Sequence, residues 1–140
     1  ALGNLSPKVA LLSATEVVTQ AMPSSANAKE LLGVMTKQDH AAAQVFGPLA
    51  FDGAISPEAA KLKGIDNPVA GYADVLLVPN IETGNAIFKQ LVYFSGATAA
   101  GVLMGAKVPV MLTSRADPPA ARLASAALAV VYAHHLSQKN

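Results

Sequence analysis

The sequence contains no cysteine, which excludes disulfide bridges, thiolate metal sites and a cysteine nucleophile. Charge is also scarce: 10 Lys and Arg and 9 Asp and Glu among 140 residues give a formal net charge of +1. Because no cluster of Lys or Arg stands out, the sequence carries no electrostatic footprint for nucleic acid or an acidic membrane surface. We therefore expect small-molecule partners, and neither nucleic acid nor a membrane.

Long apolar runs are missing as well. The best candidates, residues 97–106 and 123–133, are interrupted by Gly, Thr or Ser, and they fall short of the roughly 20 residues that span a bilayer. Hydrophobic residues nevertheless make up 52% of the chain and charged residues only 14%. A surface this poor in charge is expected to be covered by another chain or domain. We therefore expect a homodimer or higher homo-oligomer. The expected location is the cytoplasm.

Several catalytic and ligand-binding motifs are absent too. The sequence contains neither a glycine-rich phosphate-binding fingerprint nor a Gly-x-Ser-x-Gly nucleophile elbow. His134 and His135 are adjacent, so on a helix they point to different faces and cannot share a metal ion as an i, i+4 pair would. The sequence predicts no metal site, and a favourable charge at a helix C-terminus is the expected role of these two histidines.

Short apolar runs alternate with helical patterns along the chain. The runs predict strands at residues 8–13, 44–49, 75–78, 99–104 and 108–112, and apolar spacing predicts helices at residues 26–38, from 57 onward, 81–95 and 118 to about 135. Continuous apolar strands are typical of a parallel sheet that is buried on both faces. The pattern therefore predicts one α/β domain over residues 1–140, with three layers, α/β/α, around a mostly parallel sheet.

Polar chemistry follows the last predicted strand, where Ser114, Arg115 and Asp117 lie within four residues. Loops at the carboxyl ends of strands bind the ligands of open α/β sheets. A guanidinium binds phosphate or carboxylate, a hydroxyl stabilises a developing charge, and a carboxylate takes up a proton. The residues alone leave an alternative open, in which Asp117 only caps the following helix and Arg115 only forms a surface ion pair.

Two further groups are candidates for ligand binding. Asn85 and Lys89 lie one helical turn apart and could present an amide and an ammonium to one ligand. Residues 82–85 could equally be an ordinary helix start with an exposed lysine one turn later. Residues 47–52 are predicted to form a tight turn in which Gly and Pro set the backbone and Asp52 caps or binds a ligand.

Four segments taken together resemble the phosphate acetyltransferase and phosphate butyryltransferase family: residues 47–56, residues 69–79, Thr-Gly-Asn at 83–85 with Lys89, and Leu-Thr-Ser-Arg-Ala-Asp at 112–117. Their order and approximate spacing match as well. The resemblance implies an isocitrate/isopropylmalate dehydrogenase-like fold in a protein about twice this long, with the active site in a cleft between two α/β domains. This chain would be its C-terminal half, and about residues 109–140 would return to the first domain.

The resemblance implies acyl transfer between coenzyme A and inorganic phosphate, in which acetyl- or butyryl-CoA and phosphate give acyl phosphate and CoA. Coenzyme A is then a substrate, and no bound cofactor is implied. By the same resemblance Ser114 stabilises the transition state and Arg115 holds the phosphate. Asn85 and Lys89 match a Gly-Asn-x-x-x-Lys segment that faces the cleft, and Asp52 is expected to bind substrate.

The sequence departs from the family pattern in two places, at Asn80, where the family commonly has Asp, and beyond the Ser-Arg pair. The general base of the acetyltransferase branch is an Asp beyond the Ser-Arg pair, where this chain has Ala120 and Ala121. Asp117 is therefore either the base in a shifted position or only a helix cap. The departure also leaves an alternative function, a noncatalytic acyl-CoA-binding or assembly domain appended to another enzyme, as in some bifunctional malic enzymes. A decarboxylating dehydrogenase is excluded because its clustered metal-binding Asp residues are missing.

Overall fold

The computed structural model describes residue 3 and residues 5–36 and 42–138. Backbone contacts divide the chain into two compact units, residues 4–85 and residues 86–140 together with 1–3. Each unit is described by itself, and the domain organisation expected from the sequence stays a prediction. In the described part of the chain, none of the helices has both the length and the apolar character needed to cross a membrane.

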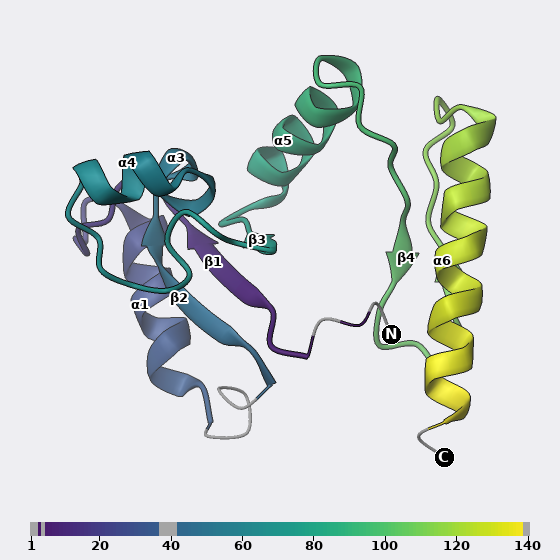
Figure 1. The fold of residues 1–140 in the computed structure, drawn as a ribbon, viewed down its shortest axis with the longest axis horizontal. Coiled ribbons are helices and arrows are strands. Elements are labelled where there is room, and N and C mark those ends of the chain that lie inside the picture. The colour runs from purple at the N-terminus through teal and green to yellow at the C-terminus, as the bar shows by residue number, and fades with distance from the viewer. Residues whose placement is uncertain (1–2, 4, 37–41, 139–140) are drawn as a thin grey trace. The chain divides into compact units, whose positions relative to one another are not determined.

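A parallel three-stranded sheet forms the centre of the unit 4–85 (Figure 1). Strand β1 (Lys8–Leu12) lies between β2 (Gln44–Leu49) and β3 (Val75–Leu77), and Val9 of β1 is in register with both neighbours. The ends of β1 and β2 are deeply buried, with Leu12 5% exposed. The predicted α/β class with a mostly parallel sheet is confirmed.

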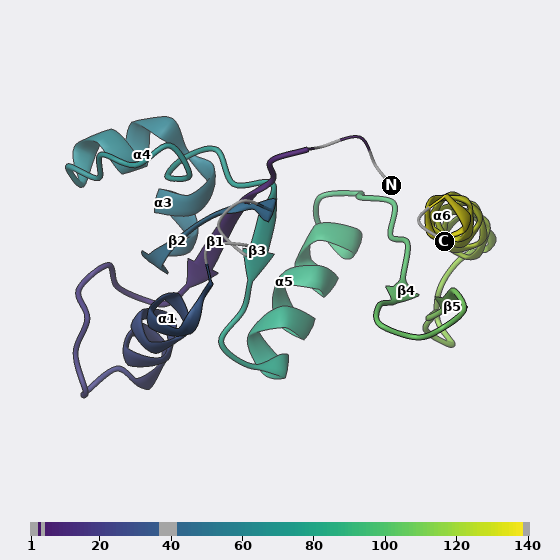
Figure 2. The same cartoon turned by 90° about the horizontal axis from the view of Figure 1, so that it is seen from below.

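Helices cover both faces of this sheet. Figure 2 shows α1 (Pro23–Val34) on one side of the strands and α3 (Phe51–Ile55) and α4 (Pro57–Leu62) on the other. The start of α4 is as predicted, because the Ser56 hydroxyl accepts a hydrogen bond from the Ala59 backbone N–H at 3.2 Å and a proline opens the first turn. The layers of this unit are therefore those of an α/β/α arrangement.

Helix α1 begins earlier than predicted. Its first residue is Pro23 rather than Ala26, because a proline at the first helical position loses no hydrogen bond. The helix ends at Val34, where the next residue is extended with φ −66° and ψ 135°. The predicted end at Gln38 falls in residues 37–41, which lie outside the described residues.

The tight turn predicted at residues 47–52 is wrong. Gly47 and Pro48 belong to β2, and Asp52 lies in the short helix α3. Among the described strands β2 pairs only with β1, and an edge strand tolerates a proline that donates no hydrogen bond. A Cβ on Gly47 would lie 2.6 Å from both the Cβ and the carbonyl oxygen of Leu11, so the close approach of the two strands requires glycine there.

The unit 86–140 contains a hairpin and a long helix. Strands β4 (Val102–Leu103) and β5 (Val110–Met111) pair antiparallel, and both are shorter than the predicted strands. Helix α5 (Ile81–Tyr93) leads into this unit from the preceding one, and α6 (Pro119–Ser137) ends it. Both helices agree with the prediction to within about two residues.

A buried serine joins α6 to the hairpin. Ser125 is 1% exposed, and its hydroxyl accepts the Gly101 N–H at 3.0 Å while donating to the Ala121 carbonyl oxygen at 2.8 Å. The Gly101 carbonyl oxygen in turn accepts the Leu112 N–H at 2.9 Å. This chain of bonds fixes the segment that leads from β5 to Ser114.

Candidate functional site

The predicted site residues Ser114 and Asp117 meet in a closed turn between β5 and α6. The Asp117 N–H donates to the Ser114 carbonyl oxygen at 3.1 Å, and the Ser114 N–H donates to Oδ2 of the Asp117 side chain at 2.6 Å. A longer bond of 3.4 Å joins the Ala116 N–H to the Ser114 hydroxyl. Asp117 thus holds the turn that presents Ser114, and both residues are half-buried.

The prediction that Asp117 caps helix α6 is wrong. The N-cap position is Pro118, with φ −68° and ψ 160°, and this residue makes no side-chain cap hydrogen bond. A residue that precedes proline is disfavoured in the helical region, and here two prolines follow Asp117 in succession. The helix therefore starts after them, and the Asp117 carboxylate bonds to the Ser114 backbone instead.

Arg115 lies at the exposed tip of this turn. The two ion pairs found among the described residues both involve Lys63, and the Arg115 guanidinium takes part in neither. The surface ion pair considered for Arg115 is therefore not found among these residues. A guanidinium that is exposed beside a half-buried hydroxyl can bind an anion such as phosphate by donating two parallel hydrogen bonds. Across the described ranges, no group of three or more His, Asp or Glu side chains is placed to hold a metal ion.

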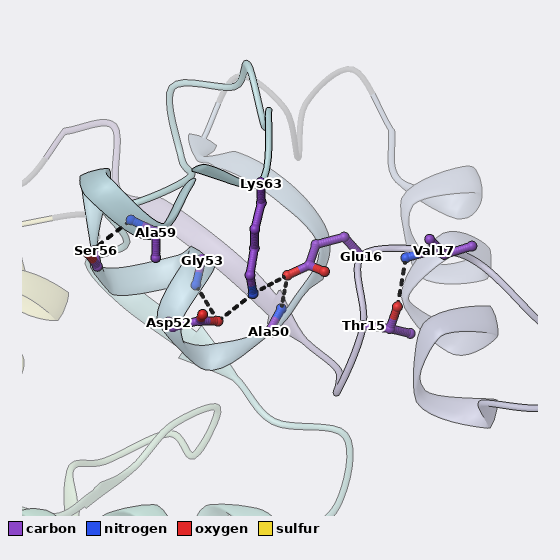
Figure 3. A network of polar contacts seen from close by, with 9 residues as sticks. All are labelled: Thr15, Glu16, Val17, Ala50, Asp52, Gly53, Ser56, Ala59 and Lys63. Atoms are coloured by element: carbon purple, nitrogen blue, oxygen red, sulfur yellow. Dashed lines mark hydrogen bonds and ion pairs between the residues drawn. The ribbon is translucent and has the colours of Figure 1, made fainter. Parts of the chain in front are cut away.

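Asp52 belongs to a charged network rather than standing alone (Figure 3). The Lys63 ammonium lies 2.6 Å from Oδ1 of Asp52 and 2.8 Å from Oε1 of Glu16. The same carboxylate oxygens also accept backbone hydrogen bonds, from Gly53 at 2.8 Å and from Ala50 at 3.3 Å. The network therefore joins the segment after β1, the start of α3 and the end of α4.

Hydrogen bonding to Lys63 is the main cause of the shifted pKa values in this network. It lowers the pKa of Asp52 with help from the Gly53 N–H, and it lowers the pKa of Glu16 against a smaller opposing effect of burial. The two carboxylates, Asp52 first, raise the pKa of Lys63. All three groups are therefore charged at neutral pH. Substrate binding by Asp52 stays a prediction.

Asn85 and Lys89 both lie on helix α5, four residues apart. The predicted helix start is confirmed, since α5 begins at Ile81 and Asn80 Oδ1 accepts the Thr83 N–H at 2.8 Å. Asn85 is exposed, and Lys89 is half-buried.

The Lys89 ammonium lies over two aromatic rings, 5.5 Å from the centroid of Phe88 and 5.6 Å from that of Tyr93. The rings attract the cation, which keeps Lys89 close to its own helix. Ligand binding by Asn85 and Lys89 stays a prediction.

The sequence-predicted residues fall into two groups. Asp52 and Asn85 belong to the unit 4–85, whereas Lys89 and the Ser114 to Asp117 turn belong to the unit 86–140. Sequence reasoning missed the partners of Asp52, because Glu16 and Lys63 are 47 residues apart and match no motif. The one available signal was that Glu16 follows a predicted strand end, as the other candidate polar residues do.

The fold and the Ser114 to Asp117 turn define an α/β protein with a candidate anion site at the end of strand β5. The family model described as phosphate acetyl/butaryl transferase matches residues 1–130, so the chain belongs to this family. The resemblance expected from the sequence is confirmed.

Individual relatives agree with this membership. The phosphate acetyltransferase of Rhizobium meliloti is 48% identical over 95% of this chain and 42% of its own length. The probable phosphate butyryltransferase of Bacillus subtilis is 47% identical over 93% of this chain and 44% of its own length. The crystal structure of a branched-chain phosphotransacylase from Enterococcus faecalis V583 matches with a TM-score of 0.85 and 44% identity, over 95% of this chain and 48% of that one. The chain thus spans less than half the length of these relatives.

Proposed function

We propose that the protein containing this chain transfers a short-chain acyl group between coenzyme A and inorganic phosphate. The observation that carries this proposal is the Ser114 to Asp117 turn, which presents a hydroxyl and an exposed guanidinium together in a chain that belongs to the family over residues 1–130. Relatives named for both acetyl and butyryl transfer support the substrate class.

In the proposed reaction the thiolate of coenzyme A attacks the carbonyl carbon of an acyl phosphate. A carbon–sulfur bond forms, the carbon–oxygen bond to phosphate breaks, and inorganic phosphate leaves; the reverse reaction makes acyl phosphate. The Arg115 guanidinium would hold the phosphate through two parallel hydrogen bonds. The Ser114 hydroxyl would donate a hydrogen bond to the oxyanion that develops on the carbonyl oxygen.

Asp117 would act on this reaction through Ser114. Because its carboxylate already accepts the Ser114 N–H at 2.6 Å, we assign it a positioning role in the turn. The alternative is that Asp117 is the base that deprotonates the thiol, at a position shifted from the family's usual one.

Several properties of the whole protein belong to the same proposal. Acyl-CoA and phosphate would be its substrates, with no bound cofactor, and this chain would form the C-terminal half of a two-domain, cytoplasmic enzyme. A homodimer or higher homo-oligomer is supported by exposed apolar side chains on α6, where Leu123 is 72% and Val130 69% exposed. Residues of this kind usually mark surfaces that another chain or domain covers.

Substitution of Arg115 tests the proposal. In the full-length gene product, Arg115→Ala should lower the rate of acyl phosphate formation from acyl-CoA and phosphate by about a hundredfold or more, because it removes the partner of the phosphate. Arg122→Ala is the matched control, since Arg122 is also exposed and lies on the neighbouring helix. Near-normal activity of Arg115→Ala would contradict the site assignment.

A second candidate function is noncatalytic binding of acyl-CoA. It is favoured by Ala120 and Ala121, which stand where the family pattern has an acid. Isothermal titration of the wild-type protein with acetyl-CoA and phosphate, run beside the acyl phosphate assay, separates the two functions. Binding without turnover would favour the second.

A further inference from the structure

The turn from Ser114 to Asp117 has two arms, and both are bonded to one buried side chain on α6. The arm that leads into the turn includes Leu112, whose N–H donates to the Gly101 carbonyl oxygen at 2.9 Å, and the Gly101 N–H donates to the Ser125 hydroxyl at 3.0 Å. The arm that leaves the turn is the start of α6, where the Ala121 carbonyl oxygen accepts the Ser125 O–H at 2.8 Å. Ser125 therefore bridges the two ends of the segment that carries the turn.

Neither arm can shift independently of these bonds. A Cβ on Gly101 would overlap the Leu112 carbonyl oxygen, so the first arm lies directly against the Gly101 backbone. The second arm begins at the cap Pro118, whose carbonyl oxygen accepts the Ala121 N–H at 3.0 Å. Figure 2 shows α6 beside β4 and β5, and the helix contacts both strands. A change at Ser125 would therefore be transmitted to both arms through hydrogen-bonded backbone.

Packing and helix formation do not by themselves require a serine at position 125. Ser125 is 1% exposed, and both of its neighbours in the chain are alanines. Alanine has a higher helix propensity than serine, and a serine hydroxyl bonded to the carbonyl four residues earlier slightly destabilises a helix. The particular contribution of the hydroxyl is an acceptor for the Gly101 N–H, which joins the hairpin to α6.

We propose that Ser125 is a positioning residue for acyl transfer, because its hydroxyl holds both arms and so sets where the Ser114 hydroxyl lies. This inference rests on the proposed function and adds a residue that touches neither the substrates nor the reacting atoms. Misplacement of a reacting group by about 1 Å can cost about a hundredfold in rate. Ser125→Ala should therefore lower kcat by about tenfold or more in protein that is folded, and it should leave the KM for acyl-CoA within about twofold of wild type.

The test uses the full-length gene product, assayed at a temperature at which melting curves show each variant to be folded. Ser125→Thr keeps a hydroxyl that can bond to the carbonyl four residues earlier, so it should recover most of the lost kcat even where its extra methyl group lowers the melting temperature. Ser137→Ala is the matched control, because Ser137 also lies on α6 and donates to a backbone carbonyl, that of His134 at 2.8 Å, but is exposed. It should leave kcat unchanged.

A double-mutant cycle with Ser114→Ala tests whether Ser125 acts through Ser114. In protein that already carries Ser114→Ala, the second change Ser125→Ala should lower kcat by less than about twofold. Two losses that multiply would overturn the inference. An unchanged kcat in Ser125→Ala together with a lower melting temperature would overturn it as well, since that result is expected of a purely structural residue. Ser125→Cys, which keeps a side chain of similar size but bonds only weakly, takes the place of Ser125→Ala if the alanine variant does not fold.

Absence of acyl phosphate formation by the wild-type protein would instead overturn the proposed function. Amide hydrogen exchange then decides whether Ser125 positions the turn. Ser125→Ala should accelerate exchange at the Ser114 amide by about tenfold or more, whereas Ser137→Ala should not change it. Equal exchange at Ser114 in the wild-type protein and in Ser125→Ala would overturn the inference.

Discussion

Asp117 offers the sharpest test of how the Ser114 turn works, because two substitutions separate its two assigned roles. Asp117→Asn keeps a side-chain oxygen that can accept the Ser114 N–H but removes the basic carboxylate. Asp117→Ala removes both. If Asp117 positions Ser114, the asparagine variant should lose less activity than the alanine variant.

The structure sets the expected magnitudes. The bond from the Ser114 N–H to Oδ2 of Asp117 is 2.6 Å long, and both residues are half-buried. A hydrogen bond to a charged group contributes about 1.5–3 kcal/mol, and partial exposure reduces this to roughly 1 kcal/mol, or about fivefold in rate. A general base contributes about 10² to 10⁴ in rate. Positioning therefore predicts kcat within about tenfold of wild type for Asp117→Asn, and a further loss of about fivefold for Asp117→Ala.

The assay is steady-state formation of acyl phosphate by the full-length protein, with kcat and KM measured between pH 6 and 9 at roughly unit intervals. Asp66→Asn serves as the control, because Asp66 is an exposed carboxylate in a different loop. Equal losses of a hundredfold or more in Asp117→Asn and Asp117→Ala would refute the positioning role. Such a result would assign the base to Asp117.

Two predictions concern stability, measured by thermal melting. Ser125→Ala should lower the free energy of unfolding by about 1–3 kcal/mol, since it leaves the Gly101 N–H without its buried partner. The control is Ser137→Ala, at the exposed serine that ends α6, which should leave the melting temperature unchanged. An unchanged melting temperature in Ser125→Ala would contradict the prediction. Lys63→Met should lower the melting temperature by an amount that depends on pH. Lys63 lowers the pKa of Glu16 and Asp52 from ordinary values of 4.5 and 3.8, and its own pKa is raised above 10.5. The stabilisation is therefore present between about pH 5 and 10, and it disappears as the pH falls through the lowered values or rises through the raised one. A difference that persists unchanged to about pH 2 would contradict the ion pairs.

The elements that the sequence predicted well depend on local signals. Strand β2 has the predicted bounds, Gln44–Leu49, and α4 begins behind the predicted serine cap at Ser56. An apolar run and a capping hydroxyl act within a few residues, so they are visible in a single segment.

The failed turn at residues 47–52 arose where a distant residue decided the local conformation. The sequence pattern predicts that Gly47 and Pro48 form a turn, but the close approach of Leu11 from another strand requires that Gly47 has no Cβ. Leu11 and Gly47 are far apart in the chain, so the sequence pattern could not show this contact.

The sequence by itself determined the family and the identity of the candidate catalytic groups, because Ser114 and Arg115 are adjacent and their motif is contiguous. Only the tertiary structure decided what the carboxylates do. The Asp117 carboxylate accepts the Ser114 N–H because two prolines delay the start of α6. Asp52 forms an ion pair with Lys63, which also pairs with Glu16. Hydrogen bonds and ion pairs extend over only a few ångströms, so the partners of a side chain are set by how the chain folds back on itself.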